Sequence, residues 1–506
     1  MDADVVVVGA GPSGLMVGAE LALAGVKVVI LEKRGEPAMP RAGVLHPRVL
    51  EIFESRGIAD RFLSRARELH AHPEASEVIW AGLPGVRYDR LDSSFPFMLL
   101  LAQVETEQIL FNRVLELGGV VRRHSEVMAM RQDADGVDVD VSDGGGATRT
   151  LRCKYLVGAD GSRSTVRQAL GIQFLGEEAT RTAINVDVRL ENPWSAPVTV
   201  TNNIHGWGLS YPLKDGITRF GLIDAIASKE SRDEPVTLDA AKAMLQRIFG
   251  TDFGITEVVW LTRFHNALFL ADRFRVGRVF IVGEAVRVHY PASGVGMNFC
   301  LMDAFNLGWK IAAAVKGWAP DWLLDSYESE RRPTIEALLD DVRRQCAIQF
   351  NYSQDMVALK RLFEHELIPL DSVNEVLRNS ISGIGAQYRT PDGSHRLAGR
   401  RVRDAGLVEG GTSRRTSIYE LLHGQKFALV DFDGNAQPLP SVIADRVNVF
   451  SAEPAVTAEL EGISSLLLRP DGHIAWASET PGDKTFNAEL RRWINIDAAS
   501  AQFATH

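Results

Sequence analysis

The first 32 residues constrain the fold of this chain most, because they read as strand, glycine-rich turn, helix, strand and acid. Val5–Val8 is a continuous β-branched run, as expected of a strand buried on both faces of a parallel sheet. The turn GAGPSG follows at once in residues 9–14, and an apolar helical segment then ends at Gly25. Residues 26–31 form a second run typical of a β-strand, and Glu32 follows it. This order is typical of the first βαβ unit of a doubly wound α/β domain.

Each part of this unit has a physical task in binding a dinucleotide. Gly9 permits the tight turn, Gly11 lets the backbone approach a pyrophosphate, and Gly14 lets helix and strand pack closely. The start of the helix offers free N–H groups and a positive dipole end to the phosphates, and Glu32 is placed to accept hydrogen bonds from a ribose. The motif alone does not separate NAD from FAD. The predicted cofactor residues here are Gly9, Gly11, Pro12, Ser13, Gly14, Glu32 and Lys33.

Two later segments identify the cofactor by resemblance. YLVGADGSRSTVR (residues 155–167) reads as strand, loop and helix, and GRVFIVGEAVRVHYPASGVGMN (residues 277–298) reads as strand, glycine-rich loop and helix start. With GAGPSG they resemble the three fingerprints of the para-hydroxybenzoate hydroxylase family, the class A flavoprotein aromatic monooxygenases. The resemblance covers residues 1–390, and the layout is closest to that of the bacterial aromatic polyketide hydroxylases.

The resemblance carries individual roles onto this sequence. Asp160 would lie between the flavin and the path of NAD(P)H, and residues 277–298 would hold the ribityl chain and the isoalloxazine ring. The residues implied to bind FAD, beyond those already named, are Arg41, Gln103, Val127, Asp160, Gly283, Glu284, Gly294, Gly296, Met297 and Asn298. Pro291, Ser293 and Gly294 are the implied catalytic loop, with Pro291 also touching substrate. No metal is expected.

The third segment departs from the family pattern at three positions. Glu284 stands where aspartate is usual, Arg287 where histidine is usual, and Ser293 where glycine is usual. Loss of the ribityl hydrogen bond of a charged group would cost about 1.5–3 kcal/mol, or roughly 10–150-fold in affinity. We therefore expect FAD binding to persist, but more weakly.

The resemblance implies an α/β fold with three domains. A Rossmann-like FAD-binding domain would comprise residues 1–75, 100–175 and 269–390, and a substrate domain with an antiparallel β-sheet would comprise residues 76–99 and 176–268. Residues 183–190, 198–204, 206–213 and 218–224 are predicted strands of that sheet. Trp207, Tyr211 and Phe220 on these strands are candidates to line a flat aromatic pocket, and each could equally be core.

Residues 391–506 resemble the thioredoxin-like C-terminal domain of the same hydroxylases. This segment lacks a CxxC pair, so it cannot perform dithiol chemistry, and a structural or dimer-forming role is the expectation. Its arginines, at positions 396, 400, 401, 403, 414 and 415, are expected to form a solvated face.

The activity implied by the resemblance is hydroxylation of an aromatic, polycyclic phenolic substrate of the polyketide type. NADPH or NADH would reduce FAD, O2 would add at flavin C4a, and the hydroperoxide would transfer one oxygen. A Baeyer–Villiger or epoxidising oxygenase would share every motif. Glu284 and Arg287 keep open a third reading, in which the fold has lost or altered its oxygenase chemistry. His46 and His289 could assist phenol ionisation, although isolated histidines are more often structural.

Composition excludes other classes of protein. The net charge of −10 argues against nucleic acid as a partner. The three cysteines are far apart and odd in number, which disfavours a disulfide framework or a zinc site and favours a reducing cytoplasm. We predict no signal peptide and no membrane segment, because the one long uncharged stretch contains the GAGPSG turn. A homodimer is left open.

Overall fold

A six-stranded sheet forms the centre of the molecule in the computed structural model, which describes residues 1–36, 42–192, 198–231, 233–435, 439, 443–453 and 458–495. Its strand order is β20-β21-β12-β1-β2-β8, parallel except for the edge pair β20–β21. The strands are β1 (Val5–Val8), β2 (Val28–Leu31), β8 (Val120–Arg122), β12 (Tyr155–Gly158), β20 (Arg275–Val276) and β21 (Val279–Ile281). The predicted first strand is confirmed to the residue, and the second begins at Val28.

Long helices cover this sheet. α1 (Pro12–Leu23) packs against both α4 (Gln103–Glu116) and α7 (Val295–Val315). The approach of α1 to α7 depends on Gly308, where a Cβ would lie 2.5 Å from the Cβ of Glu20. The remaining helices of this part are α2 (Pro47–Glu54), α3 (Ala59–Leu69), α5 (Thr165–Ala169), α8 (Ser326–Gln349), α9 (Gln354–Leu362) and α10 (Asp371–Ser382).

Small antiparallel sheets surround the centre. β9 (Glu126–Gln132), β10 (Val137–Ser142) and β11 (Thr148–Cys153) form one, and β13 (Phe174–Glu177), β19 (Leu268–Ala271) and β22 (Arg287–Val288) form another. β7 (Met98–Leu100) pairs with β3 (Val44–Leu45) and β4 (Glu74–Ala75). Residues 77–87 form a separate hairpin of β5 (Glu77–Trp80) and β6 (Leu83–Arg87), not a strand of the large antiparallel sheet.

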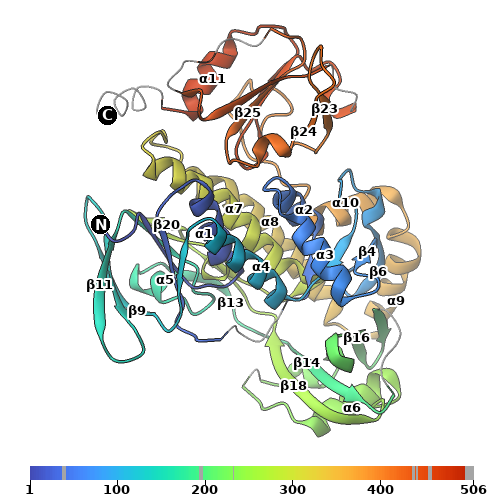
Figure 1. The fold of residues 1–506 in the computed structure, drawn as a ribbon. Helices are drawn as coiled ribbons and strands as arrows, with labels where there is room; N and C mark the ends of the chain where they lie inside the picture. The colour runs from blue at the N-terminus through green and yellow to red at the C-terminus, as the bar shows by residue number, and fades with distance from the viewer. Residues whose placement is uncertain are drawn as a thin grey trace.

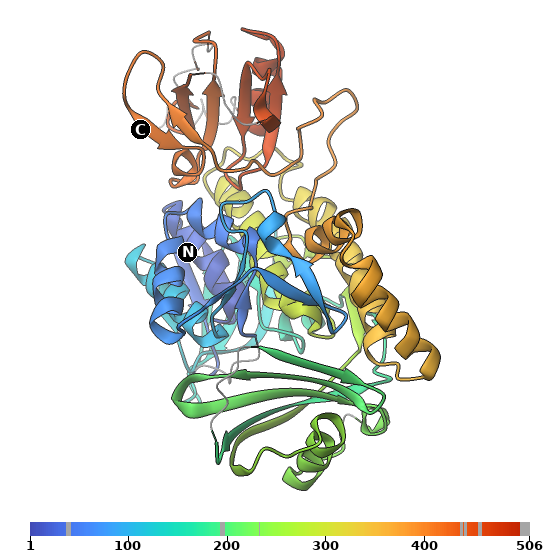
Figure 2. The ribbon, with the colours of Figure 1, turned by 90° about the vertical axis from the view of Figure 1, so that its right-hand side faces the viewer.

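That large sheet, here called the substrate sheet, has the order β15-β16-β17-β14-β18. The strands are β14 (Thr182–Leu190), β15 (Thr199–Asn203), β16 (Gly206–Pro212), β17 (Ile217–Asp224) and β18 (Ile255–His265). Four of them confirm the predicted strands, whereas β18 was not singled out. One face packs on α6 (Leu238–Phe249), and the whole unit lies at the end of the molecule opposite the C-terminal domain (Figures 1 and 2).

The C-terminal domain has a four-stranded sheet of order β26-β25-β27-β28, in which β25 and β26 are parallel and the other pairs antiparallel. The strands are β25 (Phe427–Asp431), β26 (Val447–Ser451), β27 (Ser465–Leu468) and β28 (Ile474–Ser478), with helix α11 (Thr485–Trp493) and the short hairpin β23 (Gly406–Val408) and β24 (Arg415–Ser417). This arrangement fits the expected thioredoxin-like layout.

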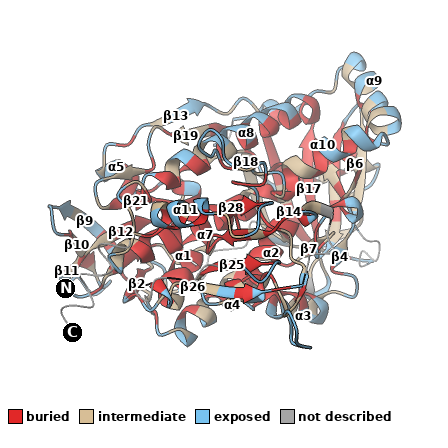
Figure 3. Cartoon of the chain, turned by 90° about the horizontal axis from the view of Figure 1, so that it is seen from above, coloured by how far each residue is buried: buried red, intermediate tan, exposed pale blue. Residues whose placement is uncertain are grey.

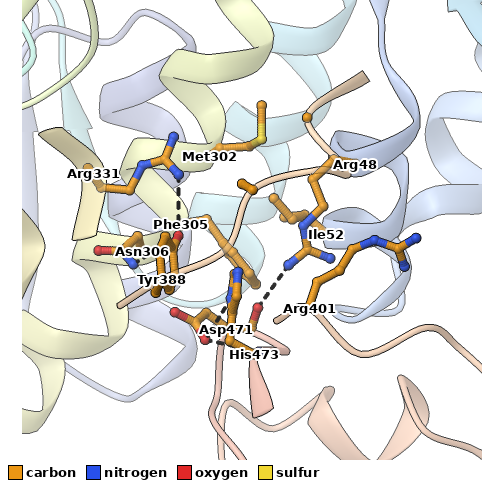
Figure 4. A pocket seen from close by; sticks show the side chains of 12 residues that line it. Arg48, Ile52, Met302, Phe305, Asn306, Arg331, Tyr388, Arg401, Asp471 and His473 are labelled. Atoms are coloured by element: carbon orange, nitrogen blue, oxygen red, sulfur yellow. Dashed lines mark hydrogen bonds and ion pairs between the residues drawn. The ribbon is translucent and has the colours of Figure 1, made fainter. Parts of the chain in front are cut away.

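The C-terminal domain packs on the outer side of α7, where Trp309 and Ala313 join a hydrophobic cluster with Phe427 and Leu429. Figure 3 shows α7 and α1 buried beneath β25, β28 and α11. This contact between α7 and the C-terminal domain is here called the seam. Polar groups also cross it, and a small pocket lies among them (Figure 4). Arg401, which was expected on a solvated face, is only 9% exposed and pairs with Glu51 at 3.2 Å, so that expectation is wrong for this arginine.

The three cysteines are free and buried. Among the described residues, no helix has both the length and the apolar character needed to cross a membrane.

Candidate active site

The glycine-rich turn and the segment after β12 meet at the carboxyl edge of the central sheet. β1 lies between β2 and β12, so the loops that leave these strands are neighbours. A Cβ on Gly9 would lie 2.4 Å from the carbonyl oxygen of Ala159 and 3.2 Å from the Cα of Asp160. Because only glycine allows this approach, the first and second fingerprints are in direct contact.

The third fingerprint reaches the same place. Gly283 follows β21, and a Cβ there would lie 2.2 Å from the Ser13 hydroxyl in the first turn of α1. Gly283 also has a φ of +69°, in the left-handed region that favours glycine. Three segments that are far apart in the sequence therefore converge on the N-terminus of α1.

Backbone donors at two helix starts suit an anionic ligand. α1 begins after Gly11 and α7 after Gly294, and no described side chain caps either helix. No described heavy atom lies within 4 Å of the position that a Cβ on Gly11 would take, which leaves its backbone open to a ligand. The N–H groups of α1 fit a diphosphate, and those of α7 fit the electron-rich edge of a flavin ring.

The acidic residue at the end of β2 lies over the glycine-rich turn. The Glu32 carboxylate accepts hydrogen bonds from the Ala10 and Arg34 backbone N–H groups, both at 2.9 Å, which is the position expected of a ribose ligand. Lys33 beside it is exposed. The buried Val127 lies on β9, two residues beyond Ser125, whose N–H donates to the Glu32 carbonyl.

Gln103 is held at the start of α4. Its side-chain Oε1 accepts from the Ala42 backbone N–H at 3.3 Å, and its backbone N–H donates to the Ala42 carbonyl at 2.9 Å. This places the residues after position 41 beside α4. Arg41 itself lies outside the described residues, so its role stays a prediction.

Asp160 helps to cap helix α5, whose N-cap residue is Ser164. Its carboxylate accepts from the Ser164 hydroxyl at 2.5 Å and from the Val166 N–H at 3.1 Å, which secures the start of α5. The residue is half-buried. A flavin or nicotinamide contact for Asp160 stays a prediction, since the contacts described are those of a cap.

Hydrogen bonds connect the loop of residues 291–298 to the segment around His46. The Asn298 amide bridges the His46 N–H at 2.7 Å and the carbonyls of Val44 and Gly294, both at 3.1 Å. A Cβ on Gly294 would lie 2.5 Å from a Val44 methyl. Gly296 and Met297 follow in the first turn of α7, with Gly296 against the His289 ring.

Ser293 has a left-handed backbone with a φ of +49°, although it is not glycine. Its hydroxyl lies 2.8 Å from both the Ile79 carbonyl and Gln345 Oε1. Its carbonyl lies 3.0 Å from His46 Nε2. A carbonyl only accepts, so Nε2 carries the proton and His46 Nδ1 accepts from the Tyr88 hydroxyl at 2.7 Å. These contacts hold the loop of residues 291–298 in a strained conformation at Ser293.

Neither histidine of this region is ready to take a proton at neutral pH. Burial lowers the pKa of His46 to about 4, against the opposing hydrogen bond to Ser293. Burial and the charge of Arg287 lower the pKa of His289 to about 4 as well. Both histidines are therefore neutral at this pH, which favours a structural role for them over assistance in phenol ionisation.

The two charged departures from the family pattern have different surroundings. Glu284 is exposed. Arg287 is 1% exposed and shares the Asp303 carboxylate with Arg331, whose Nε lies 2.7 Å from Asp303 Oδ1. Arg287 thus has a buried partner of its own, and its substitution for histidine builds an ion triad with Asp303 of α7 and Arg331 of α8.

Comparison with known protein families shows to which family this chain belongs. Residues 2–342 match the family model of the FAD binding domain, and residues 395–496 match that of the aromatic-ring hydroxylase C-terminal domain. The chain belongs to the FAD-dependent aromatic-ring hydroxylases. FAD is its cofactor, NADPH or NADH its reductant, and monooxygenation its reaction class.

Individual relatives cover almost the whole hydroxylase chain. The chain is 39% identical to a rifampicin monooxygenase of Streptomyces venezuelae, over 94% of this chain and 96% of that one. It is 33% identical to a dialkyldecalin synthase of Streptomyces rugosporus, over 98% and 99%. The structure of the anhydrotetracycline hydroxylase OxyS from Streptomyces rimosus superposes with a TM-score of 0.86 at 35% identity, covering 97% and 99%.

The three predicted substrate residues of the hydroxylase do not share one face of the substrate sheet. Trp207 donates to the Gly82 carbonyl of the β5–β6 hairpin at 3.0 Å, and the Tyr211 hydroxyl lies 3.9 Å from where a Cβ on Gly43 would be. Both lie on the face of the sheet that is turned away from α6. Phe220 points the other way, into the core against α6, and stacks on Phe253 at 5.3 Å. Phe220 therefore does not line the surface on which Trp207 and Tyr211 lie.

Charged residues on the inner face of the sheet escaped sequence reasoning. Arg219 makes a bidentate ion pair with Asp187 at 2.6 and 2.7 Å, and both are 5% exposed. The guanidinium lies 5.2 Å from the Trp260 ring. The alternation of the strands was a usable signal, because charged residues at the positions between apolar ones indicate which face looks away from α6.

Proposed function

We propose that this hydroxylase inserts one oxygen atom of O2 into a polycyclic phenolic substrate of the aromatic polyketide type. The observation that supports this most directly is the inner face of the substrate sheet, where aromatic rings flank a buried polar pair. A flat ligand with several oxygens can stack on Trp207 and Trp260 while its oxygens meet Arg219 and Tyr211.

The surroundings of the 291–298 loop suit the same ligand. Tyr290, next to Pro291, lies 5.7 Å from the Phe264 ring of β18 and 5.0 Å from the Phe350 ring. Pro291 and these rings would exclude water from the reacting edge, which an oxygen-transfer reaction requires. Reduced FAD supplies the oxygen-activating chemistry, and the chain orients the substrate and excludes water.

The names of the relatives point in the same direction. Two of the proteins compared act, by name, on rifampicin and anhydrotetracycline, which are large polyketides. The residues proposed to orient a substrate of this size here are Trp207, Tyr211, Arg219 and Pro291.

The deciding experiment is anaerobic reduction of the purified protein by NADPH or NADH with a panel of polycyclic phenols. We expect the visible flavin absorbance to bleach faster with a suitable phenol, and a product with one added oxygen to form in air. Mass spectrometry and NMR of the product separate hydroxylation from Baeyer–Villiger insertion. A flavin that is never reduced, with any ligand of the panel, would contradict the proposal.

Cofactor binding has its own matched test. Gly283→Ala should purify with much less FAD than the wild type, because the new Cβ would overlap the Ser13 hydroxyl. Gly406→Ala is the control, since no described atom lies within 4 Å of its Cβ position. Equal FAD content in the two variants would contradict the assigned site.

A further inference from the structure

Lys360 on α9 is a buried cation without an anionic partner. The residue is 4% exposed. Throughout the described ranges, no carboxylate lies within 4.0 Å of its ammonium, whereas most buried charges elsewhere in the chain are paired. Burial lowers the pKa of Lys360 to about 8, in keeping with an ammonium that has lost its water and gained no counter-charge.

Lys360 contacts a tyrosine whose own hydroxyl is unsatisfied. The Lys360 ammonium lies 4.1 Å from the centre of the Tyr352 ring. The Tyr352 hydroxyl is buried and has no hydrogen-bond partner among the described residues. A cation–π contact is weaker than an ion pair and does not replace the lost hydration of an ammonium. Two polar groups that each need a partner therefore lie side by side.

The helix does not provide the missing carboxylate. Glu364 follows Lys360 by four positions, the usual spacing for an ion pair, but α9 changes into a π-helical turn at Phe363–Leu367. Glu364 then lies beyond ion-pair distance within the part of the chain that the structure describes. π-helical turns are frequent at functional sites.

This pair lies near the proposed reaction site. Tyr352 interacts electrostatically with Tyr290, the residue before Pro291, and with Asp224 at the end of β17. Phe363, on the same helical segment as Lys360, lies 6.1 Å from the Trp80 ring of the β5–β6 hairpin. In Figures 1 and 2, α9 lies next to the edge of the substrate sheet. The pair therefore lies within electrostatic range of Tyr290, the residue that precedes the 291–298 loop.

We propose that Lys360 and Tyr352 form a subsite that binds an anionic oxygen of the substrate, a phenolate, enolate or carboxylate on a polycyclic ring system. The ammonium supplies the charge and the tyrosine hydroxyl a second hydrogen bond, while Tyr290 and Phe350 offer ring faces to the same molecule. The subsite rests on the proposed function, because it assigns a charge to the substrate of that site.

A structural role would give the opposite thermodynamic signature. A lysine that stabilises the fold loses stability when replaced, whereas an unpaired buried cation retained for a ligand destabilises the ligand-free protein. Replacement of Lys360 by methionine, which keeps the length and removes the charge, should therefore leave the unfolding temperature of the ligand-free holoenzyme unchanged or raise it.

The test compares two probes, rhein, a dihydroxyanthraquinone carboxylate, and its neutral methyl ester. Their affinities for the FAD-loaded protein are measured by calorimetry for wild type, Lys360→Met, Lys360→Arg, Tyr352→Phe and the control Arg361→Met, which removes an exposed charge from the same helix. We expect the wild type and Arg361→Met to prefer the acid by about 10–150-fold. Lys360→Met should abolish the preference, Lys360→Arg should retain part of it, and Tyr352→Phe should weaken it.

The proposed subsite is contradicted if the wild type binds the two probes with equal affinity, or binds neither. It is also contradicted by a preference that survives in Lys360→Met. If Lys360→Met cannot be purified, Tyr352→Phe decides, because loss of one hydroxyl leaves the fold intact. Failure of the proposed function is seen separately, as a flavin that NADPH and NADH never reduce, and does not depend on the probe affinities.

Discussion

Two lysines of this hydroxylase are similarly buried and have the same lowered pKa, yet they differ in their charged partners. Lys310 on α7 and Lys360 on α9 are 0% and 4% exposed, and burial lowers the pKa of each to about 8. Lys310 lies 2.6 Å from Glu330 in the seam with the C-terminal domain, whereas Lys360 contacts the Tyr352 ring and, among the described residues, has no carboxylate within 4.0 Å. A lowered pKa therefore does not distinguish a structural cation from a ligand-binding one. The charged partners of the two lysines do distinguish them.

The seam around Lys310 is satisfied almost throughout. Arg469 of the C-terminal domain binds Glu330 of α8 at 2.7 and 2.9 Å and Asp471 at 3.0 and 2.5 Å. Trp309 donates to the same Asp471 carboxylate at 3.2 Å. Such a network costs much when one member is removed, because the remaining charges stay buried. The α9 subsite should behave in the opposite way.

The strongest test of this comparison removes the centre of the seam. Arg469→Met leaves Glu330 and Asp471 as buried carboxylates with fewer donors, so we expect a loss of about 3–5 kcal/mol in the free energy of unfolding. Urea unfolding measures the loss. Arg414→Met, at a side chain 68% exposed, is the control and should change stability by less than about 0.5 kcal/mol. An Arg469→Met protein as stable as the control would show that the network does not hold the domains.

The second test sets the two lysines against each other. Lys310→Met removes one charge-assisted hydrogen bond from Glu330, which keeps Arg469, so the expected loss is about 1.5–3 kcal/mol. Lys360→Met should cause no loss. Thermal unfolding of both FAD-loaded variants, side by side with the wild type, gives the comparison. Similar destabilisation of the two would make both lysines structural.

Much of the fold was predictable because local signals were strong. The β-branched run and GAGPSG specified β1 and the start of α1, and the alternation in residues 183–224 specified four strands of the substrate sheet. The structure adds a contact to two glycines of these motifs, that of Gly9 with Ala159 and that of Gly283 with Ser13. Glycines required by close approach are visible in a sequence, since no other residue fits there.

The side-chain partners were harder to predict, because they join residues that are far apart. Phe220 was grouped with Trp207 and Tyr211 as a pocket candidate, although the alternation of charged and apolar residues assigns it to the face that α6 covers. Arg401 was assigned to solvent, yet it meets Glu51 across 350 positions of the sequence. Lys360 showed no signal at all, since a lysine on an amphipathic helix normally lies in water.

The stability of the seam should also depend on pH, through His473. His473 stacks on Tyr388 at 4.2 Å and lies 3.3 Å from Asp471, and burial lowers its pKa to about 4 although Asp471 opposes the shift. Because the unfolded chain binds this proton near the ordinary pKa of 6.5, stability should fall as the pH decreases from 6.5 to 4, by about 1.4 kcal/mol per pH unit from this residue.

His473→Asn carries no titrating group, so its stability should decrease less steeply over this range, whatever its stability at pH 7. His46→Asn removes a buried histidine with the same lowered pKa on the flavin side and should reduce the slope by a similar amount. Urea unfolding at several pH values between 4 and 7 gives the slopes. If His473→Asn keeps the slope of the wild type while His46→Asn does not, His473 is charged in the folded protein and Asp471 outweighs its burial.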